Sequence, residues 1–168
     1  DILVWREILS DGPVSKKNLW ELRSDWIFKK FGETPANYQQ KVIKEAEKLT
    51  HLDKYSETIL WFEYDLTCQI NLIYILSSIN SMYKKDNCIS LICPESIEGM
   101  PNFKGLGELN STQLNKLLSQ KIKLQKADLA LATEAWDLYL DNNFEKISAF
   151  LTRDFGNLPL LKKAFKAH

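Results

Sequence analysis

The sequence holds little cysteine and histidine. Among its 168 residues are three cysteines and two histidines, and Cys68, Cys88 and Cys93 are not spaced like metal ligands. A zinc site built from cysteine and histidine is therefore not expected. The odd number of cysteines favours a reduced chain in the cytoplasm over a disulfide-bonded secreted one.

The chain also lacks an excess of charge and a long apolar run. Lys plus Arg and Asp plus Glu each number 22, so no overall field favours nucleic acid or an anionic membrane. The longest apolar run, 72–76 with its flanks, is interrupted by Asn71, Ser77 and Ser78 and is too short to cross a bilayer. No export signal is visible. We expect no membrane role, and the net charge does not indicate nucleic acid. The oligomeric state stays open.

Three short apolar runs, at 2–5, 58–63 and 88–93, are rich in β-forming residues and are separated by helical stretches. This alternation predicts βαβ units and a parallel sheet, with helices on both faces. We therefore expect a small three-layer α/β domain with a short parallel sheet over residues 1–100. Residues 101–168 are expected to form a loop and a helical C-terminal extension.

The helices are predicted from their start and stop signals. Ser15 and Gly32 would bound a helix over 16–31, and Thr34-Pro35 would start another that reaches about 49. Further helices are expected at 66–83, 112–120, 126–141, 143–152 and 158–167.

Two carboxylates, Glu63 and Asp65, stand where the run 58–63 ends and a helix begins, and Gln69 follows one turn later. Ligands of open α/β sheets bind outside the carboxyl ends of the strands. Glu63 and Asp65 are therefore candidate catalytic residues, as ligands of Mg²⁺ or as an acid and base pair, and Gln69 is a candidate ligand-binding residue. Alternatively, Asp65 caps the helix and Glu63 pairs with a nearby Arg or Lys.

Arg6, Glu7 and Asp11 follow the first apolar run in the same way. A parallel sheet would bring them to the same edge as Glu63, where Arg6 could clamp a phosphate or carboxylate or serve as the counter-ion of Glu63. All three are candidate ligand-binding residues.

The loop Phe103-Lys-Gly-Leu-Gly-Glu-Leu-Asn110 is shaped by glycine but has no Gly-Lys-Ser/Thr ending, so it does not fit a phosphate loop. Its Lys104 and Glu108 are further candidate ligand-binding residues.

Three segments together carry a family resemblance: Ile2-Leu-Val-Trp-Arg-Glu-Ile-Leu-Ser-Asp-Gly-Pro13, Leu60-Trp-Phe-Glu-Tyr-Asp-Leu-Thr-Cys-Gln69 and Phe103-Lys-Gly-Leu-Gly-Glu-Leu109. In this order they resemble the bacterial domain-of-unknown-function family DUF1835. The resemblance implies an α/β domain with polar motifs at strand ends, and a strand with a Gly-Asp-Ser-like turn before Asp1. Tyr64 stands where members often have His, so no His-dependent proton relay is implied.

Two functions are compatible with these observations. The first is a site at the carboxyl edge of the sheet that binds a phosphorylated or nucleotide-like ligand, with a divalent metal such as Mg²⁺ and with hydrolysis or phosphoryl transfer as the reaction. The second is a non-catalytic regulatory or interaction module whose helical tail binds a protein or nucleic acid.

Overall fold

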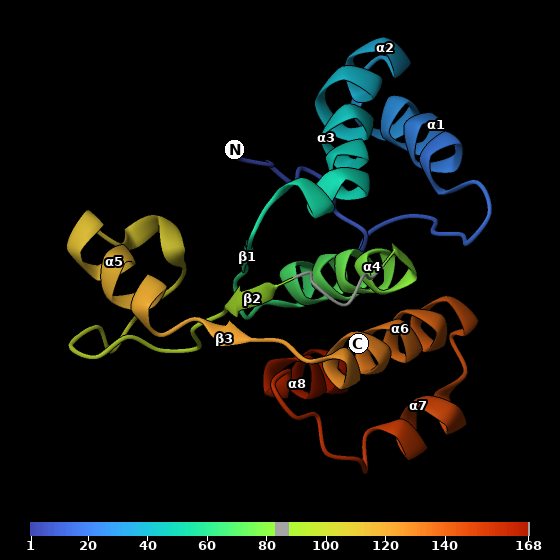
Figure 1. The fold of residues 1–168 in the computed structure, drawn as a ribbon. Coiled ribbons are helices and arrows are strands. Elements are labelled where there is room, and N and C mark those ends of the chain that lie inside the picture. The colour runs from blue at the N-terminus through green and yellow to red at the C-terminus, as the bar shows by residue number, and fades with distance from the viewer. Residues whose placement is uncertain (83–87, 168) are drawn as a thin grey trace.

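The computed structural model describes residues 1–82 and 88–167, and its centre is a mixed three-stranded sheet (Figure 1). Strand β1 (Thr58–Trp61) pairs in parallel with β2 (Ile89–Ile92), and β3 (Ile122–Lys123) pairs antiparallel to β2, in the order β1-β2-β3. The predicted α/β class is confirmed. The sheet is mixed, however, because β3 adds an antiparallel strand that no sequence pattern announced.

Helix α4 (Leu66–Met82) forms the crossover from β1 to β2 and the middle of the core. Its residues Ile70, Ile73 and Leu76 are fully buried. Helices α6 (Lys126–Asp141) and α8 (Pro159–Ala167) both pack against α4. The predicted helix 66–83 is thus confirmed to Met82, and position 83 lies outside the described residues.

A helical layer over α4 consists of α1 (Leu19–Phe31), α2 (Pro35–Tyr38), the π-helix η1 (Gln39–Ile43), α3 (Lys44–Glu47) and the 3-10 helix η2 (Lys48–Lys54) (Figure 1). Thr34 caps α2, because its hydroxyl accepts the Asn37 N–H at 3.3 Å and Pro35 occupies the first helical position.

Gly32 ends α1 with a left-handed φ of 74°, as predicted. Ser15 is not the cap of this helix. The helix begins at Leu19, and the Ser15 hydroxyl instead accepts the Lys17 N–H in a local turn.

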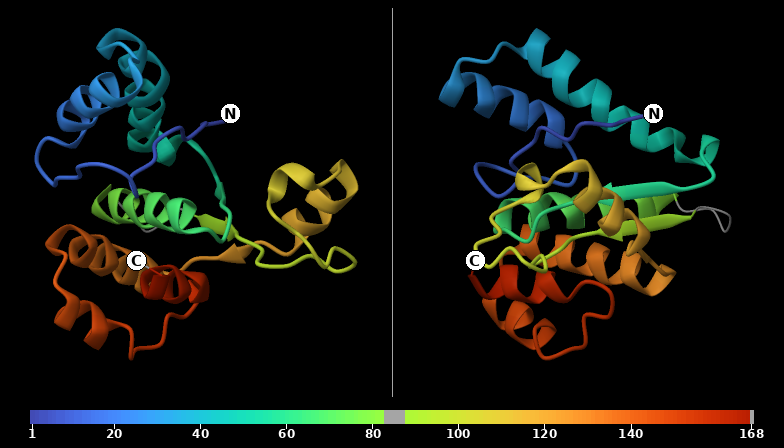
Figure 2. Two further views of the ribbon diagram at one scale, coloured as in Figure 1. Left: turned by 180° about the vertical axis from the view of Figure 1, so that it is seen from behind. Right: turned by 90° about the vertical axis from the view of Figure 1, so that its left-hand side faces the viewer.

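The C-terminal helices are α5 (Ser111–Ser119), α6, α7 (Phe144–Phe150) and α8, with a short turn η3 (Leu106–Glu108) before them. Asn110 and Gln113 form a capping box at the start of α5. The left-hand view of Figure 2 shows α5 set apart from the body of the molecule, and none of its residues is buried. None of the described helices combines the length and hydropathy that a membrane span requires.

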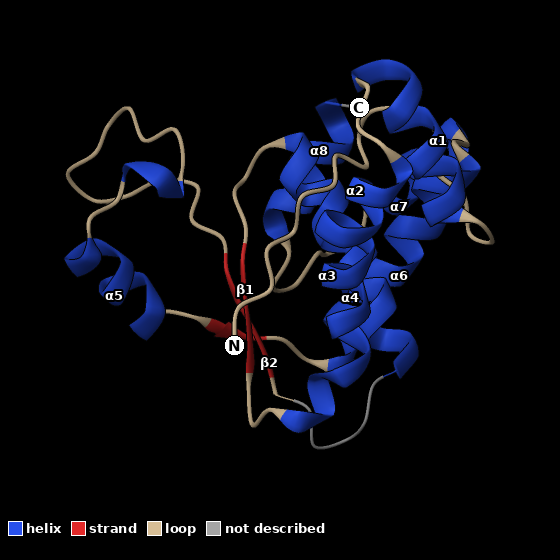
Figure 3. Ribbon diagram, turned by 90° about the horizontal axis from the view of Figure 1, so that it is seen from above, coloured by secondary structure: helices blue, strands red, loops and turns tan. Residues whose placement is uncertain are grey.

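Figure 3 shows α4 and α6 on one side of the strands and α5 alone on the other. Because α5 does not pack closely on the sheet, the predicted three layers are not confirmed. The proposed boundary near residue 100 also stays a prediction, although 101–168 supplies β3 to the sheet and packs α6 and α8 on α4.

The prediction of a buried strand at 2–5 is wrong. It is extended but unpaired, with Ile2 exposed at 81% and Val4 at 44%. The Val4 N–H donates to the Glu45 carboxylate at 3.0 Å. β-forming side chains favour an extended backbone, but a strand also needs a neighbour with free backbone groups at hydrogen-bonding distance.

Candidate functional site

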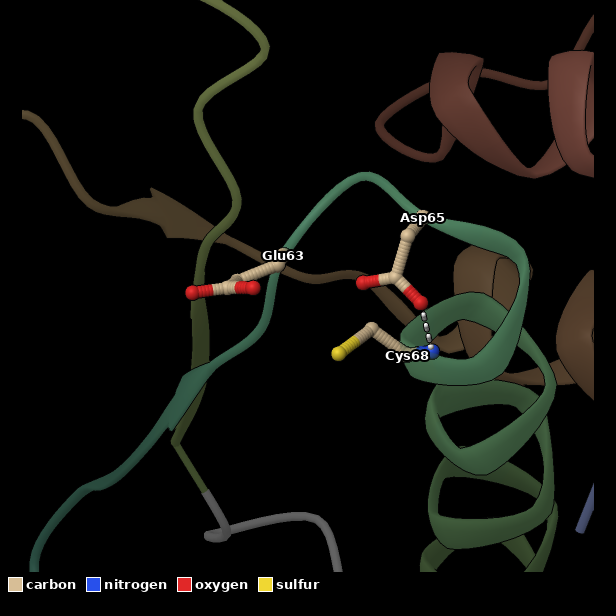
Figure 4. A group of neighbouring side chains, drawn as sticks. All are labelled: Glu63, Asp65 and Cys68. Carbon is tan, nitrogen blue, oxygen red and sulfur yellow. Dashed lines mark hydrogen bonds between the residues drawn. The ribbon is translucent and has the colours of Figure 1, made fainter. Parts of the chain in front are cut away.

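Three side chains at the carboxyl end of β1 converge in space. Glu63, Asp65 and Cys68, here called the Glu63 cluster, each offer one oxygen or sulfur atom within 4.8 Å of the others. Figure 4 shows the Asp65 carboxylate and the Cys68 sulfur near each other at the start of α4, while the Glu63 side chain extends from the end of β1 on the side away from Asp65. The cluster lies where β1 ends and α4 begins, which is the position that the sequence predicts for a site.

Asp65 holds the start of α4. Its Oδ1 accepts the Cys68 N–H at 3.0 Å, and its carbonyl accepts the first helical hydrogen bond from Gln69 (Figure 4). The capping role considered for Asp65 is therefore confirmed. A cap uses one carboxylate oxygen, so the other can still face the cluster.

Glu63 is held by the glycine loop after β2. Its Oε1 accepts the Leu106 N–H at 2.7 Å. A Cβ at Gly105 would lie 2.5 Å from Oε1 of Glu63, so any other residue there would force the Glu63 carboxylate to shift. The Tyr64 hydroxyl also donates to the Phe103 carbonyl at 3.4 Å. The loop thus makes one wall of the site with its backbone.

Gln69 is a buried residue that binds the backbone next to the Glu63 cluster. It is 1% exposed, and its amide donates to the Glu63 carbonyl at 2.9 Å and to the Cys93 sulfur at 3.3 Å. With these contacts made, Gln69 positions the end of β1 against the end of β2.

The two thiols of this region are protonated at neutral pH. Burial raises the pKa of Cys68 to about 12, and the carboxylates of Asp65 and Glu63 act in the same direction. Burial likewise raises the pKa of Cys93 to about 11. Among the ion pairs of the described residues, none joins a Lys or Arg to Glu63 or Asp65, and a bound cation would reverse the effect of these carboxylates on the pKa of Cys68.

Cys68 and Cys93 are therefore expected to react with iodoacetamide at pH 8 at least about tenfold more slowly in the folded protein than in the urea-unfolded chain, where a thiol pKa near 8.5 leaves more thiolate. Peptide mass spectrometry over a time course would measure both rates. Equal rates in the two states would contradict the buried, protonated state of these thiols.

The ionic groups after the first apolar run lie elsewhere. The Glu7 carboxylate is buried and pairs with Arg23, while Asp11 pairs with Lys30 at 2.6 Å. Arg6 donates to the carbonyls of Val4 and Lys41, both at 3.4 Å. Because 2–5 forms no strand beside β1, the sheet does not bring these residues to Glu63. Among the described residues no ion pair joins Arg6 to Glu63.

Lys104 and Glu108 belong to the glycine loop that contacts Glu63. The Glu108 carboxylate accepts the Lys104 N–H at 3.0 Å, and this hydrogen bond stabilises the conformation of the loop. Both side chains are exposed. Two contributors to the site were not predicted from the sequence: Cys68, which is the third donor of the Glu63 cluster, and the Leu106 N–H, which binds Glu63. Cys68 was detectable, because residues three apart share a helix face and it follows Asp65 by three.

No family model matches the chain, and neither a curated protein nor a solved structure resembles it significantly. The resemblance to DUF1835 accordingly stays a prediction.

The donor set of the Glu63 cluster suits a borderline metal ion better than Mg²⁺. Mg²⁺ is bound through oxygen alone, whereas Zn²⁺ accepts both carboxylate oxygen and thiolate sulfur. Ligands of tetrahedral Zn²⁺ lie about 2.0 to 2.3 Å from the ion and so roughly 3.3 to 3.8 Å from each other. The present separations of up to 4.8 Å therefore require the groups to contract around an ion.

Proposed function

We propose that this domain binds a divalent metal ion of the Zn²⁺ type at Glu63, Asp65 and Cys68. Three protein ligands leave a fourth position open, and through it the ion would hold an anionic ligand of the phosphorylated or nucleotide-like class. The observation that carries the proposal is the convergence of the three donor atoms within 4.8 Å at the carboxyl end of β1.

The chemistry of the cluster favours a metal over a direct anion site. Two carboxylates repel a free phosphate, and neither Arg6 nor Lys104 has a contact with them among those of the described residues. A metal ion removes this repulsion. When water instead fills the open position, the ion lowers the pKa of that water to about 7, which is what hydrolysis of a bound phosphate ester requires.

Saturating Zn²⁺ is expected to stabilise the protein. An ion present at a hundred times its dissociation constant adds about 2.7 kcal/mol, or roughly 5 to 10 °C in the melting temperature of a domain of this size. Thermal shift with ZnCl₂, MnCl₂ and MgCl₂ measures this, and MgCl₂ is expected to give the smallest shift. Adding ADP or inorganic phosphate to the Zn²⁺-loaded protein tests the ligand class separately.

Three substitutions remove the donors with little harm to the fold. Asp65→Asn keeps the helix cap, Glu63→Gln keeps an acceptor for the Leu106 N–H, and Cys68→Ser is nearly isosteric. Each is expected to abolish most of the Zn²⁺ shift. Matched controls are Glu98→Gln, at a carboxylate 87% exposed, and Cys88→Ser. A Zn²⁺ shift that persists in the triple variant would contradict the proposal.

One observation favours the competing interaction module. Helix α5 buries none of its residues, and Leu118 in α5 and Ile122 in the following strand β3 are exposed at 38% and 47%. If the tail binds nucleic acid, affinity for a labelled oligonucleotide falls steeply with salt and is unchanged by Glu63→Gln. That outcome, with no shift from any metal, would favour this second function.

A further inference from the structure

A cavity lies near the end of α4 that is remote from the Glu63 cluster. Helix α4 lies between α1 and α6 (Figure 1), and the cavity forms where its C-terminal half meets the first turn of α1 and the middle of α6. Its volume is about 470 Å³, within the range of small-molecule sites. Ser78, which lines it, follows Cys68 by ten residues on α4, a helical rise of about 15 Å. We call this separate site the α4 cavity.

Three aromatic side chains line the α4 cavity: Trp20, Tyr74 and Trp136. The ring centre of Tyr74 lies 5.8 Å from that of Trp20 and 5.2 Å from that of Trp136, with interplanar angles of 86° and 72°. The rings hold one another in place, so a ligand does not have to order them. Trp20 and Tyr74 are half-buried, which leaves part of each ring accessible. Aromatic surface of this kind binds another planar ring.

Polar groups of the lining have hydrogen-bonding capacity left. The Asn80 side chain donates to the Thr133 hydroxyl at 3.0 Å, and its carbonyl oxygen has no partner in the described part of the chain. The Ser77 hydroxyl makes no hydrogen bond to a described residue, whereas Ser78 donates to the Tyr74 carbonyl at 2.9 Å. An amide oxygen and a hydroxyl are suitable partners for the hydroxyl groups of a sugar.

The charged residues of the lining leave one positive charge. Lys16 pairs with Asp137 at 2.6 Å, so these two neutralise each other. Lys17 also lines the cavity, and none of the ion pairs between described residues includes it. Its ammonium stands on a long flexible side chain that can follow an anion. An anionic group is therefore favoured near Lys17.

The lining selects among possible ligands. An apolar ring compound would leave Ser77, Asn80 and Lys17 without a partner, and a free sugar would leave the aromatic rings without one. A nucleoside monophosphate carries all three complementary parts. Its base is planar, its ribose carries two neighbouring hydroxyls, and its phosphate is an anion that lysine binds.

We propose that the α4 cavity binds a nucleoside monophosphate without a metal ion. The base packs on Trp20 and Tyr74, the ribose hydroxyls bind Asn80 and Ser77, and the phosphate pairs with Lys17. This binding is independent of the proposed metal site, because the lining of the cavity and the Glu63 cluster share no residue among those described.

AMP is the direct probe, titrated into the full chain in EDTA and followed by tryptophan fluorescence and by isothermal titration calorimetry. Saturable binding that quenches the fluorescence is expected, because the base lies against Trp20. Two matched ligands separate the parts of the nucleotide: adenosine lacks the phosphate, and ribose 5-phosphate lacks the base. Each is expected to bind at least about tenfold more weakly than AMP.

Two substitutions test the cavity from the protein side. Lys17→Gln, at an exposed position, is expected to weaken AMP binding about tenfold and to leave adenosine binding unchanged. Lys29→Gln is the matched control, because this lysine is also exposed but lies on the last turn of α1. Trp20→Phe keeps a ring in the cavity and removes the fluorophore, so quenching by AMP is expected to fall while the calorimetric affinity changes little.

Absence of AMP binding in EDTA, equal affinities for AMP and adenosine, or undiminished quenching in Trp20→Phe would overturn the proposal. So would AMP binding that requires added Zn²⁺, because the nucleotide would then be held at the Glu63 cluster.

Discussion

Arg23→Met is expected to lower the free energy of unfolding by about 3 to 5 kcal/mol, the loss typical of breaking a buried ion pair from one side. Arg23 is completely buried, and its guanidinium donates to both oxygens of Glu7 at 3.1 and 2.7 Å. It also donates to the Ile8 carbonyl at 3.2 Å, and the Tyr38 hydroxyl donates to Glu7. Without the guanidinium, the Glu7 carboxylate would stay buried beside Tyr38, whose pKa is raised by burial and further by Glu7. Urea denaturation followed by tryptophan fluorescence measures the loss.

Two controls separate charge from packing. The double variant Glu7→Leu with Arg23→Met is expected to lose less than Arg23→Met alone, because it leaves no unpaired charge. Lys30→Met, which breaks the exposed pair with Asp11, is expected to change stability by at most about 1 kcal/mol. A loss from Arg23→Met as small as that from Lys30→Met would contradict a structural role for the pair.

The ion pair with Arg23 explains why Glu7 does not lie in the candidate site, although the sequence suggested it as a ligand-binding residue. A carboxylate after an apolar run is typical of a strand-end site, and nothing near Glu7 in the chain names its partner. The partner left a signal of its own, however. Arg23 falls on the apolar face of α1, four residues after Leu19 and three before Trp26, and a charged residue on such a face is usually paired.

The main elements could be predicted because their signals are local. Thr34-Pro35, Gly32 and the Asn110 cap fix helix ends through backbone geometry within a few residues. The sheet edges could not be predicted in this way. β3 is only two residues long and exposed, and 2–5 has the composition of a strand without a paired neighbour. Strand pairing depends on residues far away in sequence, which a single sequence does not reveal.

The same distinction between local and long-range signals applies to the candidate site. The strand end with Glu63 and Asp65 was predictable from an apolar run that stops at two carboxylates. Its third donor, Cys68, follows from helical spacing, but the docking of Gly105 and Leu106 on Glu63 joins segments about forty residues apart. Only the three-dimensional structure relates them.

Asn71→Leu is expected to lower the free energy of unfolding by about 3 kcal/mol, because it leaves two buried backbone groups without a hydrogen-bond partner. The Asn71 side chain accepts the Leu9 N–H at 3.1 Å and donates to the Glu7 carbonyl at 2.8 Å. It is 5% exposed, and Leu9 and Glu7 are buried as well. Leucine has a similar volume but can satisfy neither group. This one amide therefore ties the N-terminal segment to α4, and urea denaturation measures its contribution.

Asn80→Leu is the matched control on the same helix. Asn80 is half-buried, and its side chain donates to the Thr133 hydroxyl at 3.0 Å as its one hydrogen bond within the described part of the chain, so the expected loss is about 1 kcal/mol. Faster hydrogen exchange of the Leu9 amide in Asn71→Leu, but not in Asn80→Leu, would assign the difference to the N-terminal segment. Equal losses in the two variants would mean that Asn71 acts through α4 alone.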